Sequence, residues 1–433
     1  MKNDGIHETK RKLKKSQKLT KLGQIIYITC ANFMNNNLWE SASSCSFGFI
    51  FSFIPLSLII IALLTGLIKL SPDIYQWVLK IVDEIRPVYD ITPFLSNLMN
   101  NNAIHWVDIL LGFWVIWMAR KMFLSIMQAM TKIFRSVSER KTIINQLFIF
   151  ILEFLIVILI AFTIISAFIF NQILDHSFLL ENFSDIIPFF ITRNSHNLLS
   201  VGMYIIIFIS SSCIFKLSSG THPKLSWCLI YAALSTFSFY IFSLFINKFM
   251  NLTNYNVIYG TVSTLVILMM KVYFFFVIFL FFAQMIYVTQ YFDILLKSQI
   301  YLLPTEEEEG LINNLRRIMF LNPSALKTND NTLYFKAGDL IYAKGEASNC
   351  VYYLRSGKIT EKCGESIISY TPGSFFGDTQ CLLNQPRTGN AIADTEVKLI
   401  VFSAEEFKEL IRRSPVAATK AVAKISEDSF TQA

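Results

Sequence analysis

The sequence predicts an all-α bundle of about six transmembrane helices, followed by a small β-roll with flanking helices. The first observation is composition: 53% of the 433 residues are hydrophobic and only 16% are charged, against roughly 25% charged in a soluble domain. The second is that the apolar excess lies in roughly the first 300 residues, whereas the remainder mixes charges, glycines and short apolar runs. We therefore expect two unlike parts joined end to end.

Six apolar stretches account for the predicted bundle. A helix needs about twenty mostly apolar residues to cross the hydrocarbon of a bilayer. The stretches that approach or exceed this length are Ser41–Ile68, Ile104–Ala119, Phe154–Leu174, Asn194–Phe215, Leu225–Asn247 and Phe249–Phe292. The second stretch is the shortest, and it runs into an amphipathic continuation from Met122 to Val137 whose apolar residues recur every three to four positions.

The distribution of cations predicts the orientation of the bundle. With six crossings, the same side receives Lys10 to Lys21, Arg120 to Lys141, Lys216 with Lys224, and Lys297 with Arg316 and Arg317. The positive-inside rule makes that side cytoplasmic, and the acidic loops 69–103 and 175–193 then face the periplasm. We expect a bacterial inner-membrane protein with both termini in the cytoplasm. Its basic N-terminus faces anionic lipid rather than nucleic acid.

Three charged residues lie within the apolar stretches. We expect Asp108 and Glu153 to face a polar cavity, because a carboxylate facing lipid would cost about 2.5–3.5 kcal/mol. Lys271 has two interpretations: it lines a substrate path, or its long side chain reaches the membrane interface. The sequence leaves both open.

The C-terminal part has the pattern of a β-roll. Short apolar runs alternate with turns such as Gly338-Asp339 and Pro372-Gly373, which predicts many short strands. The expected strands are Leu333–Phe335, Leu340–Tyr342, Val351–Leu354, Ile367–Tyr370, Ala391–Ala393 and Val397–Phe402. Helices are expected at Leu311–Met319 before the roll, and at Ala404–Arg412 and Pro415–Ile425 after it.

This part resembles a cyclic nucleotide-binding domain over roughly residues 320–430. The stretches F-K-A-G-D-L-I-Y-A-K-G-E and V-Y-Y-L-R-S-G-K-I carry the resemblance, and Phe375 to Thr388 is similar to the phosphate-binding cassette of that family. The spacing from Gly377 to Arg387 matches the cassette. The competing interpretation is a roll that keeps the fold but has lost its ligand.

The resemblance implies a role for each cassette residue. Arg387 would offer two parallel donors to the cyclic phosphate, Gly377 would let the backbone and the following short helix approach it, and Asp378 would hold the ribose 2′-hydroxyl where the family has glutamate. The expected ligand-binding residues are Phe376, Gly377, Asp378, Thr379, Pro386, Arg387, Thr388 and Asn390. A cyclic nucleotide is the expected ligand, with cAMP favoured over cGMP, and no metal is expected.

The membrane part resembles the YihY/BrkB family of inner-membrane proteins, once labelled ribonuclease BN. Asn37 to Leu58 and Leu225 to Tyr259 carry the resemblance, together with an Ile-Tyr-Gly signature at Ile258, and Lys271 departs from the family where tryptophan is expected. A metal-dependent nuclease needs clustered His, Asp and Glu ligands. The five histidines are scattered, and the seven cysteines have no metal-ligand spacing, so we expect no enzyme.

The predicted organisation is a basic N-terminus (1–22), a transmembrane domain (23–292), a helical connector (293–319) and a nucleotide-binding domain (320–433). Two functions fit it. The first is a transporter regulated by a cyclic nucleotide on its cytoplasmic domain. The alternative is a membrane-anchored scaffold or receptor without transport, whose roll recruits a partner. A homo-oligomer is compatible with either function.

Overall fold

The computed structural model describes residues 20–51, 123–135, 195–217, 221–249, 257–303, 316, 319–320, 332–364 and 366–431. The chain forms two compact units: unit 1 comprises residues 1–31 and 288–433, and unit 2 comprises residues 32–287. Outside the described residues lie Asp108 and Glu153, the predicted spans 104–119 and 154–174, residues 52–68 of the first predicted span, the acidic loops 69–103 and 175–193, and most of the predicted helix 311–319.

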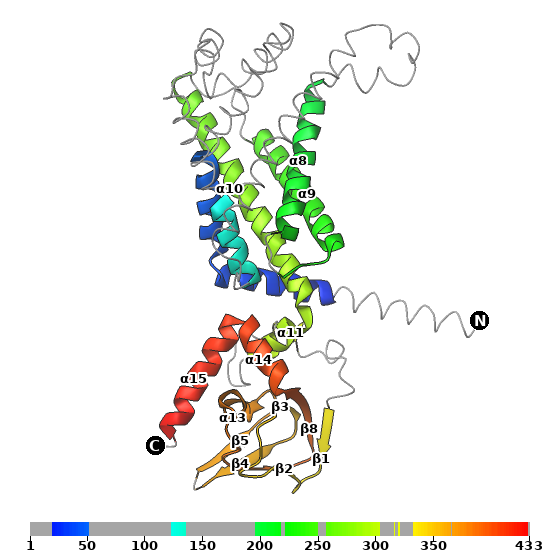
Figure 1. Ribbon diagram of the computed structural model, residues 1–433, viewed down its shortest axis with the longest axis vertical. Coiled ribbons are helices and arrows are strands. Elements are labelled where there is room, and N and C mark those ends of the chain that lie inside the picture. Colours follow the sequence, from blue (N-terminus) through cyan, green and yellow to red (C-terminus); the bar gives the residue numbers. More distant parts are fainter. Residues whose placement is uncertain are drawn as a thin grey trace, which may run out of the picture. The chain divides into compact units, whose positions relative to one another are not determined.

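Unit 2 is mostly helical in its described residues. It contains helical residues 38–51 and 123–134, α8 (Ser195–Leu217), α9 (Leu225–Phe249) and most of α10 (Val257–Gln290). The predicted helices at Asn194–Phe215 and Leu225–Asn247 are confirmed within two residues. Figure 1 shows α8, α9 and α10 running lengthwise beside one another, and α8 contacts α9 along its length.

Two helices in the described ranges are long and apolar enough to cross a membrane, namely Leu225–Phe249 and Val266–Gln290. The core helix of a soluble protein is mostly buried, whereas only 17% of the apolar window of α9 is buried. Its exposed side chains include Leu229, Ile230, Leu234, Phe237, Ile241, Leu244 and Phe245. The other face packs on α10 through ring pairs such as Phe242 with Phe274, 4.7 Å apart.

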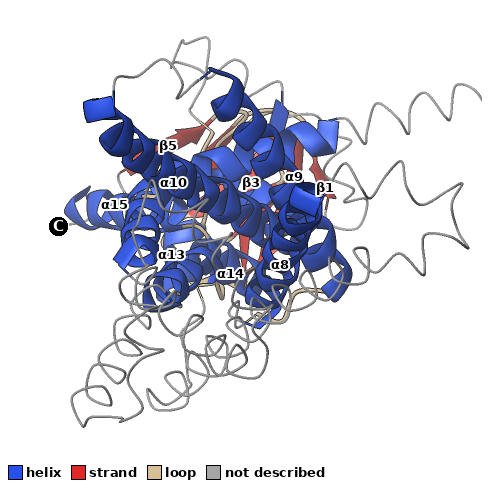
Figure 2. Cartoon of the chain, turned by 90° about the horizontal axis from the view of Figure 1, so that it is seen from above, coloured by secondary structure: helices blue, strands red, loops and turns tan. Residues whose placement is uncertain are grey.

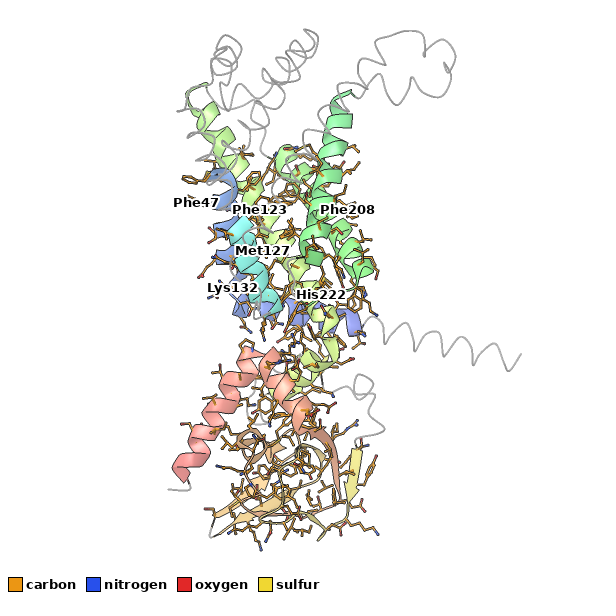
Figure 3. The ribbon with its side chains drawn as sticks, in the orientation of Figure 1. Phe47, Phe123, Met127, Lys132, Phe208 and His222 are labelled. Carbon is orange, nitrogen blue, oxygen red and sulfur yellow. The ribbon has the colours of Figure 1, made fainter. Side chains whose placement is uncertain are left out.

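Two lysines of unit 2 have polar partners on neighbouring helices. The ammonium of Lys271 on α10 donates to Asn247 Oδ1 on α9 at 2.6 Å. Lys132, on the helix that also carries Phe123 and Met127 (Figure 3), donates to Ser41 Oγ at 3.4 Å. Each ammonium thereby has a polar partner on a largely apolar helical unit, although Lys132 is exposed and Lys271 only partly buried.

Unit 1 contains all the strands of the described residues, and Figure 2 sets these strands apart from the helices by colour. They are β1 (Thr332–Phe335), β2 (Leu340–Tyr342), β3 (Cys350–Ser356), β4 (Ile359–Cys363), β5 (Ser366–Tyr370), β6 (Phe375–Phe376), β7 (Asn390–Ala393) and β8 (Val397–Ser403). They form two antiparallel four-stranded sheets, ordered β1-β8-β3-β6 and β2-β7-β4-β5. A cluster of buried apolar residues from both sheets, including Leu354, Ile359 and Leu399, forms the core.

All six predicted strands are present, while the sequence pattern missed β4 and β6. β4 alternates buried and exposed residues but carries Thr360, Glu361 and Lys362, so it does not form an apolar run. β6 has only two residues, Phe375 and Phe376, which pair with β3. A search for apolar runs does not detect strands that are defined by hydrogen bonding to a neighbouring strand rather than by composition.

The helices of unit 1 flank the roll. They are α11 (Phe292–Tyr301), α13 (Asp378–Leu383), α14 (Ala404–Arg413) and α15 (Pro415–Thr431). α15 is six residues longer than the sequence predicts. Ser403 begins α14 with a capping box, because its hydroxyl accepts from Glu406 N while the Glu406 carboxylate accepts from Ser403 N. α11 packs on α14, where Lys297 pairs with Glu406 at 3.1 Å.

Candidate functional site

The cassette is the segment between β6 and β7, and its shape depends on Gly377. Gly377 has a φ of +70°, the left-handed region that side chains with a Cβ rarely adopt. A Cβ at this position would lie 3.0 Å from Arg387 Cζ and closer still to Nη1. The glycine therefore serves both the turn into α13 and the close approach of the Arg387 guanidinium.

Arg387 points into the roll and is 3% exposed. Its Nη1 donates to Gly377 O at 2.8 Å, and its Nη2 donates to Cys350 O. Its Cζ lies 4.4 Å from the centroid of the Tyr342 ring and 5.6 Å from that of Tyr352, within the range of cation–π attraction. Among the described residues no carboxylate forms an ion pair with this guanidinium.

A buried cation without a counter-anion is unusual, because burial removes its hydration and a paired charge normally compensates. Arg387 carries five N–H donors, and its two carbonyl partners do not neutralise its charge. The arrangement suits an incoming anion with several acceptor oxygens, such as a phosphate. Rigid aromatic rings and backbone carbonyls hold the guanidinium in place for it.

Aromatic side chains pack against Arg387. Tyr342, Tyr352 and Tyr370 stack against Phe376, with ring centroids 5.1 to 6.1 Å apart. The Tyr370 hydroxyl donates to the Glu361 carboxylate at 2.8 Å. Burial, and then the charge of Glu361, raises the pKa of Tyr370 far above its ordinary value. Tyr370 therefore stays neutral and acts as a hydrogen-bond donor.

Asp378, the first residue of α13, is 2% exposed and has two partners from distant elements. Lys424 Nζ on α15 lies 2.6 Å from Oδ1, and the Tyr301 hydroxyl on α11 donates to Oδ2 at 3.2 Å. The same ammonium donates to Phe375 O at 3.1 Å. The carboxylate that the resemblance assigns to a ribose hydroxyl is thus engaged by two flanking helices.

The remaining predicted residues lie at different depths. Phe376 is fully buried and Thr379 nearly so. Thr388 accepts from Gln380 Nε2 at 3.0 Å, across the cassette. Pro386 is exposed. Asn390 is exposed on β7 while the next residue faces the core, and its amide oxygen accepts from Lys344 N at 2.7 Å. The structure therefore brings Phe376 to Thr379 together with Arg387 and Thr388, and orients Asn390 outward.

Sequence reasoning missed Tyr301, Lys424, Glu361 and the tyrosines of the stack. Tyr301 lies 77 residues before Asp378, and Lys424 lies 46 after it. No local spacing signals contacts over such separations. The one available signal was the i, i+4 spacing of Lys420 and Lys424, which places both ammonium groups on one face of α15.

Comparisons with known proteins agree with this geometry. The cyclic nucleotide-binding domain family matches residues 332–414. The chain is 33% identical over 81 residues to a cAMP-dependent protein kinase regulatory subunit of Hypocrea atroviridis, covering 18% of each chain. It is 30% identical over 82 residues to a cyclic nucleotide-gated potassium channel of Rhizobium etli, covering 19% of this chain and 23% of that one. The chain spans about a fifth of the length of these curated relatives.

Two solved structures also match this region. The catabolite activator protein of Thermus thermophilus is 23% identical with a TM-score of 0.22, covering 23% of this chain and 50% of that one. The sensor domain of the transcriptional regulator DNR from Pseudomonas aeruginosa is 18% identical with a TM-score of 0.22, covering 24% and 73%.

Residues 332–414 are thus a cyclic nucleotide-binding domain, joined to a helical region with two long apolar helices. The helical region has its own family match, over residues 29–298, which is more than half of the sequence. The chain belongs to the virulence factor BrkB family, and the resemblance seen in the sequence is confirmed for both parts.

Proposed function

We propose that the chain is an inner-membrane protein with about six spans and both termini in the cytoplasm, and that its C-terminal domain binds a cyclic nucleotide which regulates transport by the membrane region. The observation that carries the proposal is Arg387, a buried guanidinium without an anionic partner among the described residues, set in a cassette of matching spacing. The anion it lacks is the cyclic phosphate.

The binding test uses the full chain in nanodiscs and a fluorescent cAMP analogue. Arg387→Glu replaces the phosphate-binding cation with an anion, and we expect binding to fall by at least a hundredfold, since charged hydrogen-bonding partners contribute about 1.5–3 kcal/mol each and the new charge also repels. Arg355→Glu on β3, half-buried and outside the cassette, is the matched control and should bind like wild type. Equal affinities for wild type and Arg387→Glu would refute the proposal.

Base preference follows from competition in the same assay. We expect cAMP to displace the probe at lower concentrations than cGMP. The regulatory half of the proposal needs a second measurement, namely solute flux into liposomes with and without cAMP. A flux that responds to cAMP in wild type but not in Arg387→Glu supports a regulated transporter. Binding without any flux, together with a partner recovered on the immobilised chain, supports the scaffold instead.

The number of spans is tested by topology. We propose that loops 69–103 and 175–193 face the periplasm. Single reporter fusions in each loop, and one after residue 433, should give periplasmic, periplasmic and cytoplasmic signals respectively. A periplasmic signal at the C-terminus would refute the even number of crossings and remove the nucleotide domain from the compartment in which its ligand is made.

A further inference from the structure

The contacts of Asp378 connect three elements of unit 1. Lys424 on α15 forms a short ion pair with one carboxylate oxygen, and Tyr301, the last residue of α11, donates its hydroxyl to the other. Lys420, one turn before Lys424, donates to Tyr301 O at 2.9 Å. Asp378, α11 and α15 are therefore held together by hydrogen bonds that meet at one buried carboxylate.

α11 is the segment that follows α10 in the chain, after the single residue Tyr291. α11 also contacts α14 and β6 of the nucleotide-binding domain. The Tyr301 ring packs edge-on against Phe375 at 5.0 Å and Phe407 at 5.3 Å, and the Arg413 guanidinium lies 3.9 Å from the centre of the Tyr291 ring. The hydroxyl of Tyr301 is the contact that reaches the cassette helix itself.

Asp378 is 2% exposed and each of its carboxylate oxygens already has a partner, so a ligand hydroxyl that binds this carboxylate competes with a group that is already there. The two candidates differ in strength. The Lys424 contact is 2.6 Å long and joins opposite charges, whereas the Tyr301 contact is 3.2 Å long and has a neutral donor. Both bonds have an ionised acceptor, but only the Lys424 contact also joins two opposite charges and is short, so Tyr301 is displaced first.

Resting on the nucleotide site proposed above, we propose that Tyr301 competes with the ribose 2′-hydroxyl of the ligand for Asp378. A cyclic nucleotide that has this hydroxyl takes the place of the Tyr301 hydroxyl and releases α11 from the cassette. A nucleotide that lacks it binds through Arg387 and leaves the contact intact. Tyr301 is thus a positioning residue. Through it, the release of α11 from the cassette depends on whether the sugar of the ligand has a 2′-hydroxyl.

The test measures affinities of the full chain in nanodiscs for cAMP and for 2′-deoxy-cAMP. Tyr301→Phe removes only the hydroxyl and keeps the ring that packs on Phe375 and Phe407. We expect it to bind cAMP about tenfold more tightly than wild type, which corresponds to about 1.4 kcal/mol, and to bind 2′-deoxy-cAMP with unchanged affinity. Tyr334→Phe on β1, where the tyrosine is 71% exposed, is the matched control and should change neither affinity.

The outcomes separate the two proposals. If Tyr301→Phe changes both affinities equally, or neither, while Arg387→Glu abolishes binding, the nucleotide site stands and the competition is refuted. If wild type binds neither nucleotide, or Arg387→Glu binds normally, the proposed function fails and the competition fails with it.

A second measurement needs no change at Tyr301. Spin labels are introduced as unnatural amino acids at the exposed positions Asp293 on α11 and Gln385 after α13. We expect cAMP to shift the distance distribution between the labels and 2′-deoxy-cAMP at saturation to leave it unchanged. An identical response to both nucleotides would overturn the proposal.

Discussion

Gly377 offers a quantitative test of how the cassette holds Arg387. In Gly377→Ala the backbone keeps a φ near +70°, which costs a residue with a Cβ about 1–2 kcal/mol. The new Cβ also occupies space held by the guanidinium, 3.0 Å from Cζ, so Arg387 has to move and lose its bond to Gly377 O. A hydrogen bond to a charged group contributes about 1.5–3 kcal/mol, which together with the backbone cost of about 1–2 kcal/mol gives a total of about 2.5–5 kcal/mol.

Gly364→Ala is the matched control. Gly364 lies in the turn between β4 and β5 with a φ of +62°, and no atom lies within 4 Å of the Cβ that alanine would add. Gly364→Ala therefore loses only the free energy of holding a residue with a Cβ at positive φ, about 1–2 kcal/mol. The two variants should differ by about 2 kcal/mol in the free energy of opening the cassette, which is roughly thirtyfold in the equilibrium constant. This difference isolates the contact with Arg387.

Cys381 on α13 provides the assay. Its side chain is fully buried, and burial raises the pKa of its thiol, so alkylation in the full chain requires the cassette to open. The rate of Cys381 alkylation, followed by mass spectrometry, should rise roughly thirtyfold more in Gly377→Ala than in Gly364→Ala. Equal rates in the two variants would show that Arg387 does not rest on Gly377, and would refute the account of the cassette.

Two further predictions concern α14. Ser403→Ala removes the capping box and should lower the free energy of unfolding of unit 1 by about 1 kcal/mol. The measurement is the rate of Cys381 alkylation in urea. Ser366 is exposed on β5, and Ser366→Ala should have no such effect. For Glu409, burial alone would raise the pKa, but the hydrogen bond and charge of Arg413, followed by Arg412, outweigh it and lower the pKa below 4.5. Because its folded-state pKa is lowered, the ionised Glu409 stabilises the folded state above about pH 5. This stability is lost as the pH falls through the folded-state pKa. The stability difference between wild type and Glu409→Gln should therefore be constant near neutral pH and shrink as the pH falls below about 5, and a difference that stays constant on acidification would contradict this.

Local sequence patterns predicted a large share of the fold. Helices α8 and α9 were found because an uninterrupted apolar run of membrane length has few alternatives. The short helix expected after Gly377 is present as α13, since the glycine and the family spacing define where it begins. Arg387, the expected phosphate ligand, is buried in the structure, and its role stays a prediction. These features depend on neighbours in the sequence.

The partners of strands and of side chains do not depend on neighbours in the sequence. The length of β6 is set by its pairing with β3, and the outward orientation of Asn390 by the alternation of side chains along β7. For Asp378 the resemblance implied a carboxylate that holds a ribose hydroxyl, but its partners Tyr301 and Lys424 come from 77 residues upstream and 46 residues downstream.

The sequence by itself thus determined a BrkB-type membrane part, a nucleotide-binding roll and the cassette that joins Gly377 to Arg387, because apolar periodicity and motif spacing are local properties of the chain. Only the tertiary structure decided which side chains contact the Asp378 carboxylate before any ligand binds. Hydrogen bonds between α11, α13 and α15 exist only after the roll has folded and brought their side chains within 3.2 Å of one carboxylate.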